Sequence, residues 1–364
     1  MDLAERLRDH ARDLGLAGFG FCGVEPFDDT RRHLDEAVAS GRAGKLSFTF
    51  SDPGTSTDVR RSFPWARSLV VAAHSYATGS GNPGPAEPGT SRVARFAVDD
   101  HYAPLRTALG AIAVLLQSAG HRAEVLVDDN RLVDRAAAVR AGVGWWGKSS
   151  MVLVPGAGPW VLLGSVVTDA DVPPDPVMRR DCGTCDACIP ACPTGAIVAP
   201  GILDARRCLA HWAQAPGPIP TELRQAMGDR LYGCDDCLEA CPPGHRAIGK
   251  GRGTTGRVEL VPLLALDDRA LRARFERFYV PRNDVRYLRR NALVALGNTG
   301  DTAAVEVAAG YAGHPDPLLR AHASWALGRL GGPTARAALR MVEDIDRDPA
   351  VVAEATAALA GTLS

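Results

Sequence analysis

The sequence has no long apolar run and almost no net charge. Its 364 residues carry a formal net charge of −1, so the overall charge predicts no polyanionic partner, and any basic surface must be local. No stretch approaches the ~18 apolar residues that a membrane span needs. Residues 1–20 lack the apolar core of a secretion signal and fit an amphipathic helix. These absences predict a cytoplasmic protein with no membrane partner.

Cysteine, by contrast, is concentrated in one part of the chain. Eight of the nine cysteines lie between residues 173 and 250, among prolines and glycines. Because cytoplasmic proteins rarely keep structural disulfides, this usage indicates metal or redox chemistry. The ninth, Cys22, lies far upstream in an apolar segment, and we interpret it as a small buried hydrophobic residue.

Residues 1–172 have the pattern of an α/β domain. A helix is predicted between Pro104, at its start, and Gly120, at its end. In α/β sheets, ligands bind at the edge where strands end, so that edge is the first place to expect a site. Apolar, β-branched runs predict strands at 18–24, 68–76, 124–129, 150–155 and 160–169.

The C-terminal part repeats itself. RRNALVALGNTGD (289–301) recurs as RAHASWALGRLGG (320–332), with the shared ALG shifted by 31 residues. A helix-pair repeat of this length is typical of a short HEAT-like solenoid. A Gly-rich linker (249–257) precedes it.

These patterns predict a multidomain α+β/α fold in three consecutive parts. The first is an α/β domain, the second a small module organised by whatever its cysteines bind, and the third a HEAT-like helical repeat domain. Their predicted bounds are 1–172, 173–250 and 258–364.

The first cysteine run, CGTCDACIPACP, has the spacing of an iron–sulfur motif. Three thiolates within seven residues can surround one corner of a cubane cluster, while the fourth, displaced by one extra residue, ligates a second cluster in two-cluster ferredoxins. Zinc sites usually use two separated C-x2-C pairs instead. Iron–sulfur chemistry is therefore favoured over zinc. The four residues are Cys182, Cys185, Cys188 and Cys192.

The second run, GCDDCLEACPP, lacks the first cysteine of the motif, because Leu231 occupies that position. Cys208 is the one cysteine of this stretch left to fill the vacancy. Eight cysteines then hold two [4Fe–4S] clusters, which would form a short path for single electrons. Cluster one is assigned Cys182, Cys185, Cys188 and Cys241, and cluster two is assigned Cys192, Cys208, Cys234 and Cys237.

An acceptor site for the electrons is predicted where VLVDDN ends a strand. Asp128 and Asp129 lie at this strand end, although either of them, or Asn130, could simply cap the following helix. The glycines of AGVGWWGKSS would let the backbone approach a bulky ligand closely, or could form a tight turn.

At this point the chain resembles the epoxyqueuosine reductase family over nearly its full length. The resemblance rests on VDDNRLVDRAAAVRAGVGWWGKSS, WVLLGSVVTD, CGTCDACIPACPTGAI, LDARRCLAHW, IPTELRQAMGDRLYGCDDCLEACP and the terminal repeats. It implies a cobalamin-binding catalytic α/β domain, a ferredoxin-like module with two [4Fe–4S] clusters, and repeats that help to hold tRNA. The implied reaction removes the epoxide oxygen of epoxyqueuosine at the tRNA wobble position, with electrons passing through the clusters to cobalt.

The family's proton donor falls on Asp128, and an acid is what an opening epoxide needs. Lys148 is the best candidate for a polar contact to a corrin side chain, and Ser149, Arg95 and Tyr232 complete the expected cofactor-binding set. Cobalamin rests on the resemblance alone, because the D-x-H-x-x-G motif is absent. The sequence departs from the family pattern at 101–103, 129–131 and 243–244, around the expected cofactor pocket and on the surface beside the second cluster.

A local basic stretch predicts the tRNA surface. Eight arginines lie between residues 269 and 290, where only two acidic residues occur. Arginines on one solenoid face would contact phosphates, although a solvated helix face is the alternative. The tRNA-binding residues expected are Arg282, Arg286, Arg289 and Arg290.

The other expected partner is a low-potential electron donor of the flavodoxin or ferredoxin type, acting on a monomer. Two other functions remain open at this point. One is a corrinoid reductase of a small molecule, related to reductive dehalogenases, which would have no use for the arginines. The other is a ferredoxin-like carrier, which would not need the α/β domain.

Overall fold

The computed structural model describes residues 2–77, 86–248 and 256–361. By packing, the chain divides into two compact units, each built from three separate segments. The first unit comprises Met1–Ser80, Asp99–Arg206 and Asp235–Gly253. The second unit comprises Gly81–Val98, Arg207–Cys234 and Thr254–Ser364. The three consecutive domains of the sequence analysis remain a prediction, and most of the predicted linker, residues 249–255, lies outside the described residues.

A four-stranded sheet organises the first unit, in the order β1-β2-β7-β4. The middle strands β2 and β7 are buried along almost their whole length, which explains their continuous apolar sequences. Cys22 in β1 has 0% exposure, and burial raises the pKa of its thiol to about 12, as expected for a structural cysteine. The strands are β1 (Gly18–Gly23), β2 (Ser68–Ser75), β7 (Val161–Thr168) and β4 (Ala123–Val127).

Every pairing in this sheet is antiparallel, so the carboxyl ends of its strands do not all lie at one edge. Instead, β2 and β4 both run opposite to β7, which lies between them. The ends of β2 and β4 therefore meet the start of β7 at one edge of the sheet. This edge brings together Tyr76, Asp128 and Trp160, each the residue next to its strand.

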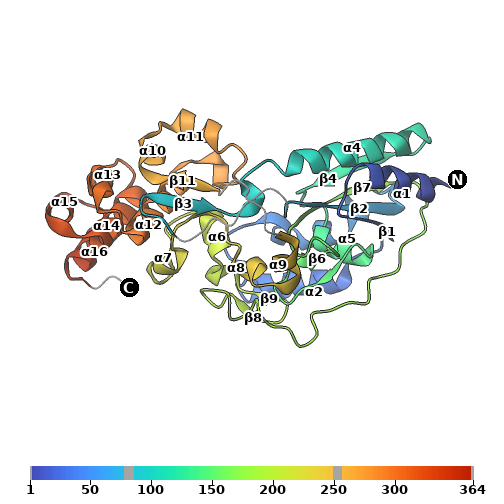
Figure 1. Cartoon of the computed structure of the whole chain (residues 1–364), viewed down its shortest axis with the longest axis horizontal. Coiled ribbons are helices and arrows are strands. Elements are labelled where there is room, and N and C mark those ends of the chain that lie inside the picture. Colours follow the sequence, from blue (N-terminus) through green and yellow to red (C-terminus); the bar gives the residue numbers. More distant parts are fainter. Residues whose placement is uncertain (1, 78–85, 249–255, 362–364) are drawn as a thin grey trace. The chain divides into compact units, whose positions relative to one another are not determined.

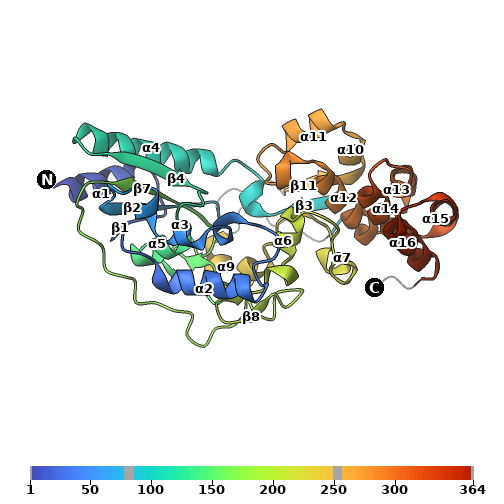
Figure 2. The ribbon, with the colours of Figure 1, turned by 180° about the vertical axis from the view of Figure 1, so that it is seen from behind.

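Helices cover both faces of this sheet, as Figures 1 and 2 show from opposite sides. Helix α4 (Tyr102–Ser118) packs on β4 and β7 with α1 (Leu3–Asp13) beside it, and α5 (Asp134–Arg140) packs on β1, β2 and β7. The unit also contains α2 (Asp28–Ala39), α3 (Pro53–Thr57), β5 (Trp145–Trp146), β6 (Val152–Leu153), β8 (Ile197–Ala199), β9 (Ile202–Leu203), α8 (Asp236–Glu239), α9 (Pro242–Ile248) and the 3-10 turns Phe48–Phe50 and Val59–Arg61.

The second unit joins a small sheet to a helical array. Strand β3 pairs in parallel with β10 and antiparallel with β11, which brings residues 90–93 of the N-terminal half into this unit. Its elements before the repeats are β3 (Thr90–Val93), α6 (Leu209–Gln214), α7 (Thr221–Met227), β10 (Arg230–Tyr232), β11 (Arg257–Glu259), α10 (Leu260–Ala265), α11 (Asp268–Arg274) and the 3-10 turns Arg95–Ala97 and Pro281–Asn283; a further turn, Ala205–Arg207, crosses the boundary between the two units.

The repeated sequences form the predicted helical pairs. Helices α12, α14 and α16 carry the repeat and pack in succession, and Gly297 of α12 allows this because a Cβ there would lie 2.9 Å from the Trp325 ring. Each DP pair begins a helix: Asp316 and Asp348 accept N-terminal N–H groups, and the proline follows. The helices are α12 (Arg286–Thr299), α13 (Val305–Ala312), α14 (Pro317–Leu330), α15 (Gly332–Ile345) and α16 (Pro349–Leu359), with the 3-10 turn Thr302–Ala304.

Within the described ranges, no helix combines the length and the apolar character needed to cross a bilayer.

Candidate active site and cluster module

Four cysteines of the first unit, the ones predicted to hold cluster one, lie near one another. Burial raises the pKa of Cys188 and of Cys241, and Cys182 and Cys185 add to the rise at both thiols, which shows that the four are near neighbours. Among the described residues, no three His, Cys, Asp or Glu side chains converge on a single ion.

Short backbone turns shape the rest of the module. Cys192 lies beyond the turn at Ile189, and its sulfur accepts the N–H of Ala196 at 3.1 Å. Cys192 and Cys237 belong to the first unit, whereas Cys208 and Cys234 belong to the second. The ligand set of cluster two therefore stays a prediction.

The sheet edge holds a buried aromatic group beside the cysteines. The Tyr76 N–H donates to the Trp160 carbonyl at 3.0 Å, and the two rings meet edge to face with centroids 5.9 Å apart. Burial raises the pKa of Tyr76 well above its ordinary value, and Asp235, Tyr102 and Cys237 add to the rise. Tyr76 thus lies near both a cysteine predicted for cluster two and the neighbours of Asp128.

Asp128 directly follows β4 and has the properties of a proton donor, namely solvent access and a raised pKa. Its φ of 54° is left-handed, which few residues except glycine, Asn and Asp tolerate. The residue is accessible to solvent, yet the protein around its carboxyl raises the pKa by desolvation; Arg106 opposes this and Asp129 adds to it. A raised pKa keeps more of the carboxyl protonated.

Helix capping does not explain these aspartates. Helix α5 begins only at Asp134, its N-cap is Val133, and no side chain caps it. Asp129 instead accepts hydrogen bonds from the Arg131 N–H and guanidinium, at 2.9 Å and 2.6 Å, which lower its pKa. Asp128 is left without a capping role.

Sequence reasoning missed two neighbours of Asp128. Burial raises the pKa of Asp134 strongly, with Asp128 the next cause, and the Oδ1 atom of Asp134 is buried with no hydrogen-bond partner among the described residues. Burial also raises the pKa of Tyr102, whose ring lies 5.3 Å from the guanidinium carbon of Arg106. The last of the three aspartates in VDDNRLVD, Asp134, was the available signal.

The four predicted cofactor-binding residues are divided between the units. Lys148 donates from Nζ to the Gly183 carbonyl at 2.8 Å, so its ammonium ties β5 and β6 to the cysteine loop, and Ser149 is buried beside it. Arg95 and Tyr232 belong to the second unit and are 4% and 2% exposed. Tyr232 stacks on Phe278 and donates to the Tyr279 carbonyl. Their proposed contacts with a cofactor remain predictions.

The predicted arginine surface is narrower than expected. Arg290 has 0% exposure, and its guanidinium donates to main-chain carbonyls. Arg289 is 7% exposed and is held by Asp268 at 2.5 Å and by the Leu266 carbonyl at 2.8 Å. These two arginines therefore stabilise the repeats and do not offer a guanidinium to a nucleic acid.

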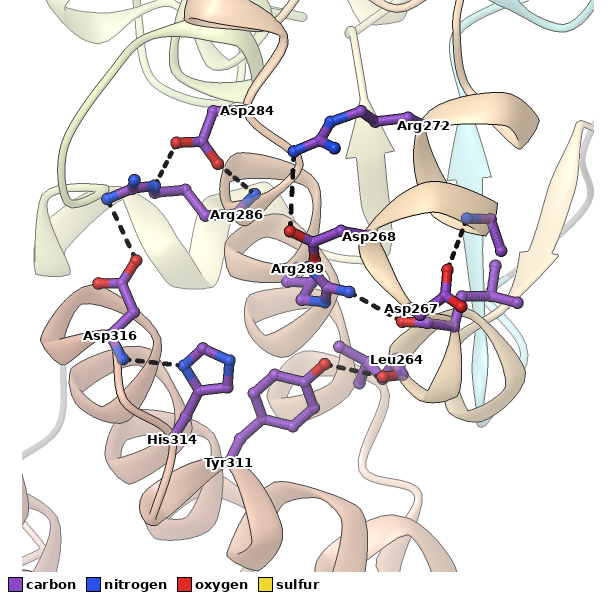
Figure 3. Close-up of polar contacts among 12 residues, drawn as sticks. Leu264, Asp267, Asp268, Arg272, Asp284, Arg286, Arg289, Tyr311, His314 and Asp316 are labelled. Atoms are coloured by element: carbon purple, nitrogen blue, oxygen red, sulfur yellow. Dashed lines mark hydrogen bonds and ion pairs between the residues drawn. The ribbon is translucent and has the colours of Figure 1, made fainter.

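The other two arginines are exposed. Arg286 bridges Asp284 at 2.5 Å and Asp316 at 3.2 Å, and Figure 3 shows it between the two carboxylates. Arg282 makes no side-chain hydrogen bond or ion pair with any described residue. Its φ is 59°, and Asn283 after it has a φ of 54°, so a strained turn presents it.

Comparison with known proteins identifies the family. Residues 181–244 match the 4Fe-4S double cluster binding domain, and residues 282–360 match HEAT repeats, which confirms both predictions from the sequence. The chain is 31% identical to epoxyqueuosine reductase of Bacillus subtilis (95% of this chain, 92% of that protein) and 32% identical to that of Pseudomonas aeruginosa (90% and 95%).

Solved structures of the same family are similar to this chain over nearly its full length. A selenomethionine-labelled epoxyqueuosine reductase has a TM-score of 0.89 and 28% identity, with 99% and 98% of the two chains covered. A second, with an epoxyqueuosine-modified tRNA-Tyr stem loop, has a TM-score of 0.87 and 28% identity, with 100% and 99% covered. The chain is therefore an oxidoreductase that belongs to the epoxyqueuosine reductase family.

Proposed function

We propose that this chain reduces epoxyqueuosine to queuosine at the wobble position of tRNA, with electrons passing through two [4Fe–4S] clusters and Asp128 donating a proton. One observation carries this most directly: Tyr76 lies near both Cys237 and the residues around Asp128 in the same compact unit. This proximity supports an electron path and a proton donor that serve the same edge of the sheet.

The chemistry matches these residues. Removing an epoxide oxygen as water leaves a C=C bond and consumes two electrons and two protons. The clusters deliver electrons singly, and Asp128 supplies a proton to the opening C–O bond. Its raised pKa supports the acid form, while solvent access supports contact with a substrate. A related Bacillus subtilis structure is named for an aspartate catalytic loop swung out of its active site (27% identity, TM-score 0.88).

Cobalamin is part of the proposal. When bound, it would supply a low-potential cobalt centre for removal of the oxygen. The residues present fit a large polar cofactor, because the buried Oδ1 of Asp134 has no donor among the described residues and a corrin carries amide donors on its rim. Lys148 and Ser149 are the proposed holders in the first unit, and Arg95 and Tyr232 in the second.

The partners are tRNA and a low-potential electron donor. A family member's structure with a modified tRNA stem loop supports tRNA as the substrate. Arg282 is the proposed phosphate contact, with Arg286 beside it. We further propose that the protein acts as a monomer in the cytoplasm, where tRNA is found.

A complementation experiment tests the function in a cell. The chain is expressed in a bacterium lacking its own epoxyqueuosine reductase, and tRNA nucleosides are analysed by mass spectrometry. We expect queuosine to reappear. Persistence of epoxyqueuosine, with the protein present and its clusters loaded, would reject the proposal.

A further inference from the structure

A pocket of about 550 Å³ opens in the first unit beside the segments that carry Cys182 and Cys241. It lies between the β6 turn, the segment before Cys182 and the start of α9. Arginines dominate its polar lining, and we call it the arginine pocket. Its argued residues are Trp145, Arg179, Arg180, Asp181, Pro243 and Arg246.

The charged residues that line the arginine pocket are mostly positive. Arg179, Arg180 and Arg246 are exposed, and none of them forms an ion pair with a described residue. Arg180 lies over the Trp145 ring at 5.7 Å. The single acidic residue, Asp181, already accepts the Gly183 N–H at 2.7 Å. Three guanidinium groups against one engaged carboxylate make a site for negative charge.

The arginine pocket adjoins the ligands of cluster one. Asp181 precedes Cys182, and Pro243 follows Cys241 by two residues. Burial raises the pKa of the Cys241 thiol while Arg246 acts in the opposite sense, which places this arginine within electrostatic reach of the thiol. Cys185, a further ligand of cluster one, is exposed. A cluster held by these cysteines would therefore lie near the surface beside the pocket, whereas Cys237 lies toward Tyr76.

We propose that the arginine pocket docks an acidic one-electron carrier protein, which reduces cluster one. This inference rests on the proposed function and names the surface that its electron donor uses. Each encounter oxidises the carrier by one electron and reduces cluster one by one electron. Two encounters supply the two electrons that the epoxide consumes.

Charge and position favour a redox protein over a second nucleic-acid site. Electrons must enter where a cluster is close to solvent, and opposite charges speed the encounter of two proteins and fix its orientation. RNA would also be attracted to arginines, but it brings no electron to the exposed cluster. Binding of RNA at this pocket is therefore an outcome of the test.

Charge reversal tests the proposal on the cluster-loaded protein. The variant is Arg179→Glu with Arg246→Glu, and the matched control is Arg336→Glu with Arg340→Glu, two exposed arginines of α15. Binding of an acidic bacterial flavodoxin is measured by calorimetry at low and high salt. We expect the pocket variant to weaken binding by roughly tenfold or more and to flatten its salt dependence, while the control binds as the wild type does.

A second readout separates this inference from the proposed function. Reduction of the clusters is followed optically, with flavodoxin or with dithionite as reductant. The pocket variant should be slow with flavodoxin and normal with dithionite. The inference would be overturned if the pocket variant binds flavodoxin normally and its clusters are reduced by flavodoxin at the normal rate. It would also be overturned if the variant loses tRNA binding while flavodoxin binding is unchanged. If the wild type binds flavodoxin but turns over no tRNA with either reductant, only the proposed function fails.

Discussion

The Arg290 guanidinium donates to the main-chain oxygen of Trp212 at 2.7 Å, so a repeat helix is bonded to the segment that follows Cys208. The same guanidinium donates to the carbonyls of Ala215 and Gly217. Complete burial lowers the pKa of Arg290 to about 9, and the ring of Tyr287 lies 5.1 Å away. This arginine therefore joins two parts of the second unit from inside its core.

Replacing Arg290 should destabilise the fold. Arg290→Met leaves several buried carbonyls without their donor, and we expect a loss of about 2–4 kcal/mol in the free energy of unfolding. Denaturant unfolding checks this. Arg336→Met, at an exposed position of α15, is the control and should change stability by less than about 0.5 kcal/mol. Equal stability of the two variants would contradict the structural role of Arg290.

Arg282 should matter for tRNA and not for stability. Arg282→Ala removes an exposed guanidinium that has no described partner, so we expect weaker tRNA binding and a salt dependence shallower by about one phosphate contact. Fluorescence anisotropy of a labelled anticodon stem loop, measured over a salt series, provides the test. Arg340→Ala serves as the control. An unchanged salt slope for Arg282→Ala would remove this residue from the proposed surface.

The two cysteine assignments predict distinct cluster losses. Cys241→Ser should leave cluster one without a full ligand set, and Cys208→Ser should do the same to cluster two, so each variant should retain about half of the iron. Iron and sulfide analysis with electron paramagnetic resonance measures this. Cys22→Ser should keep both clusters. A Cys208→Ser protein with both clusters intact would refute Cys208 as a ligand of cluster two.

The pH profile should respond to the charges around Asp128. The proton donor works in its acid form, so the rate should fall as pH rises through its pKa. Arg106 holds that pKa down and Asp129 pushes it up. Arg106→Gln should therefore move the fall to higher pH, and Asp129→Asn should move it to lower pH. Single-turnover rates with a chemical reductant check both shifts; identical profiles would exclude Asp128 as the titrating acid.

Much of the fold followed from local patterns. Strand positions, helix α4 and the repeats came from apolar periodicity and from Pro, Gly and Asp at helix ends, which are local signals. The pairing of strands did not, because an antiparallel sheet and a parallel one can share the same apolar runs. Nor did the assembly of units from separated segments, since β3 pairs with strands more than a hundred residues away.

The site was predicted in part for similar reasons. Cysteine spacing is set by ligand geometry, so a module for two [4Fe–4S] clusters could be predicted from the chain, and residues 181–244 match such a domain. The roles of Arg289 and Arg290 could not, because burial of an arginine depends on carbonyls supplied by distant segments. Asp134 was missed because its importance comes from burial beside Asp128, which sequence spacing alone does not reveal.

Nucleoside mass spectrometry on tRNA treated with the purified protein tests the central claim most directly. The protein is loaded with iron, sulfide and cobalamin without oxygen, reduced chemically, and given epoxyqueuosine-containing tRNA. The account predicts that wild type yields queuosine, lighter by one oxygen atom, and that Asp128→Asn with intact clusters is slower by at least about 100-fold. Unchanged epoxyqueuosine with the loaded wild type, or full activity in Asp128→Asn, would contradict it.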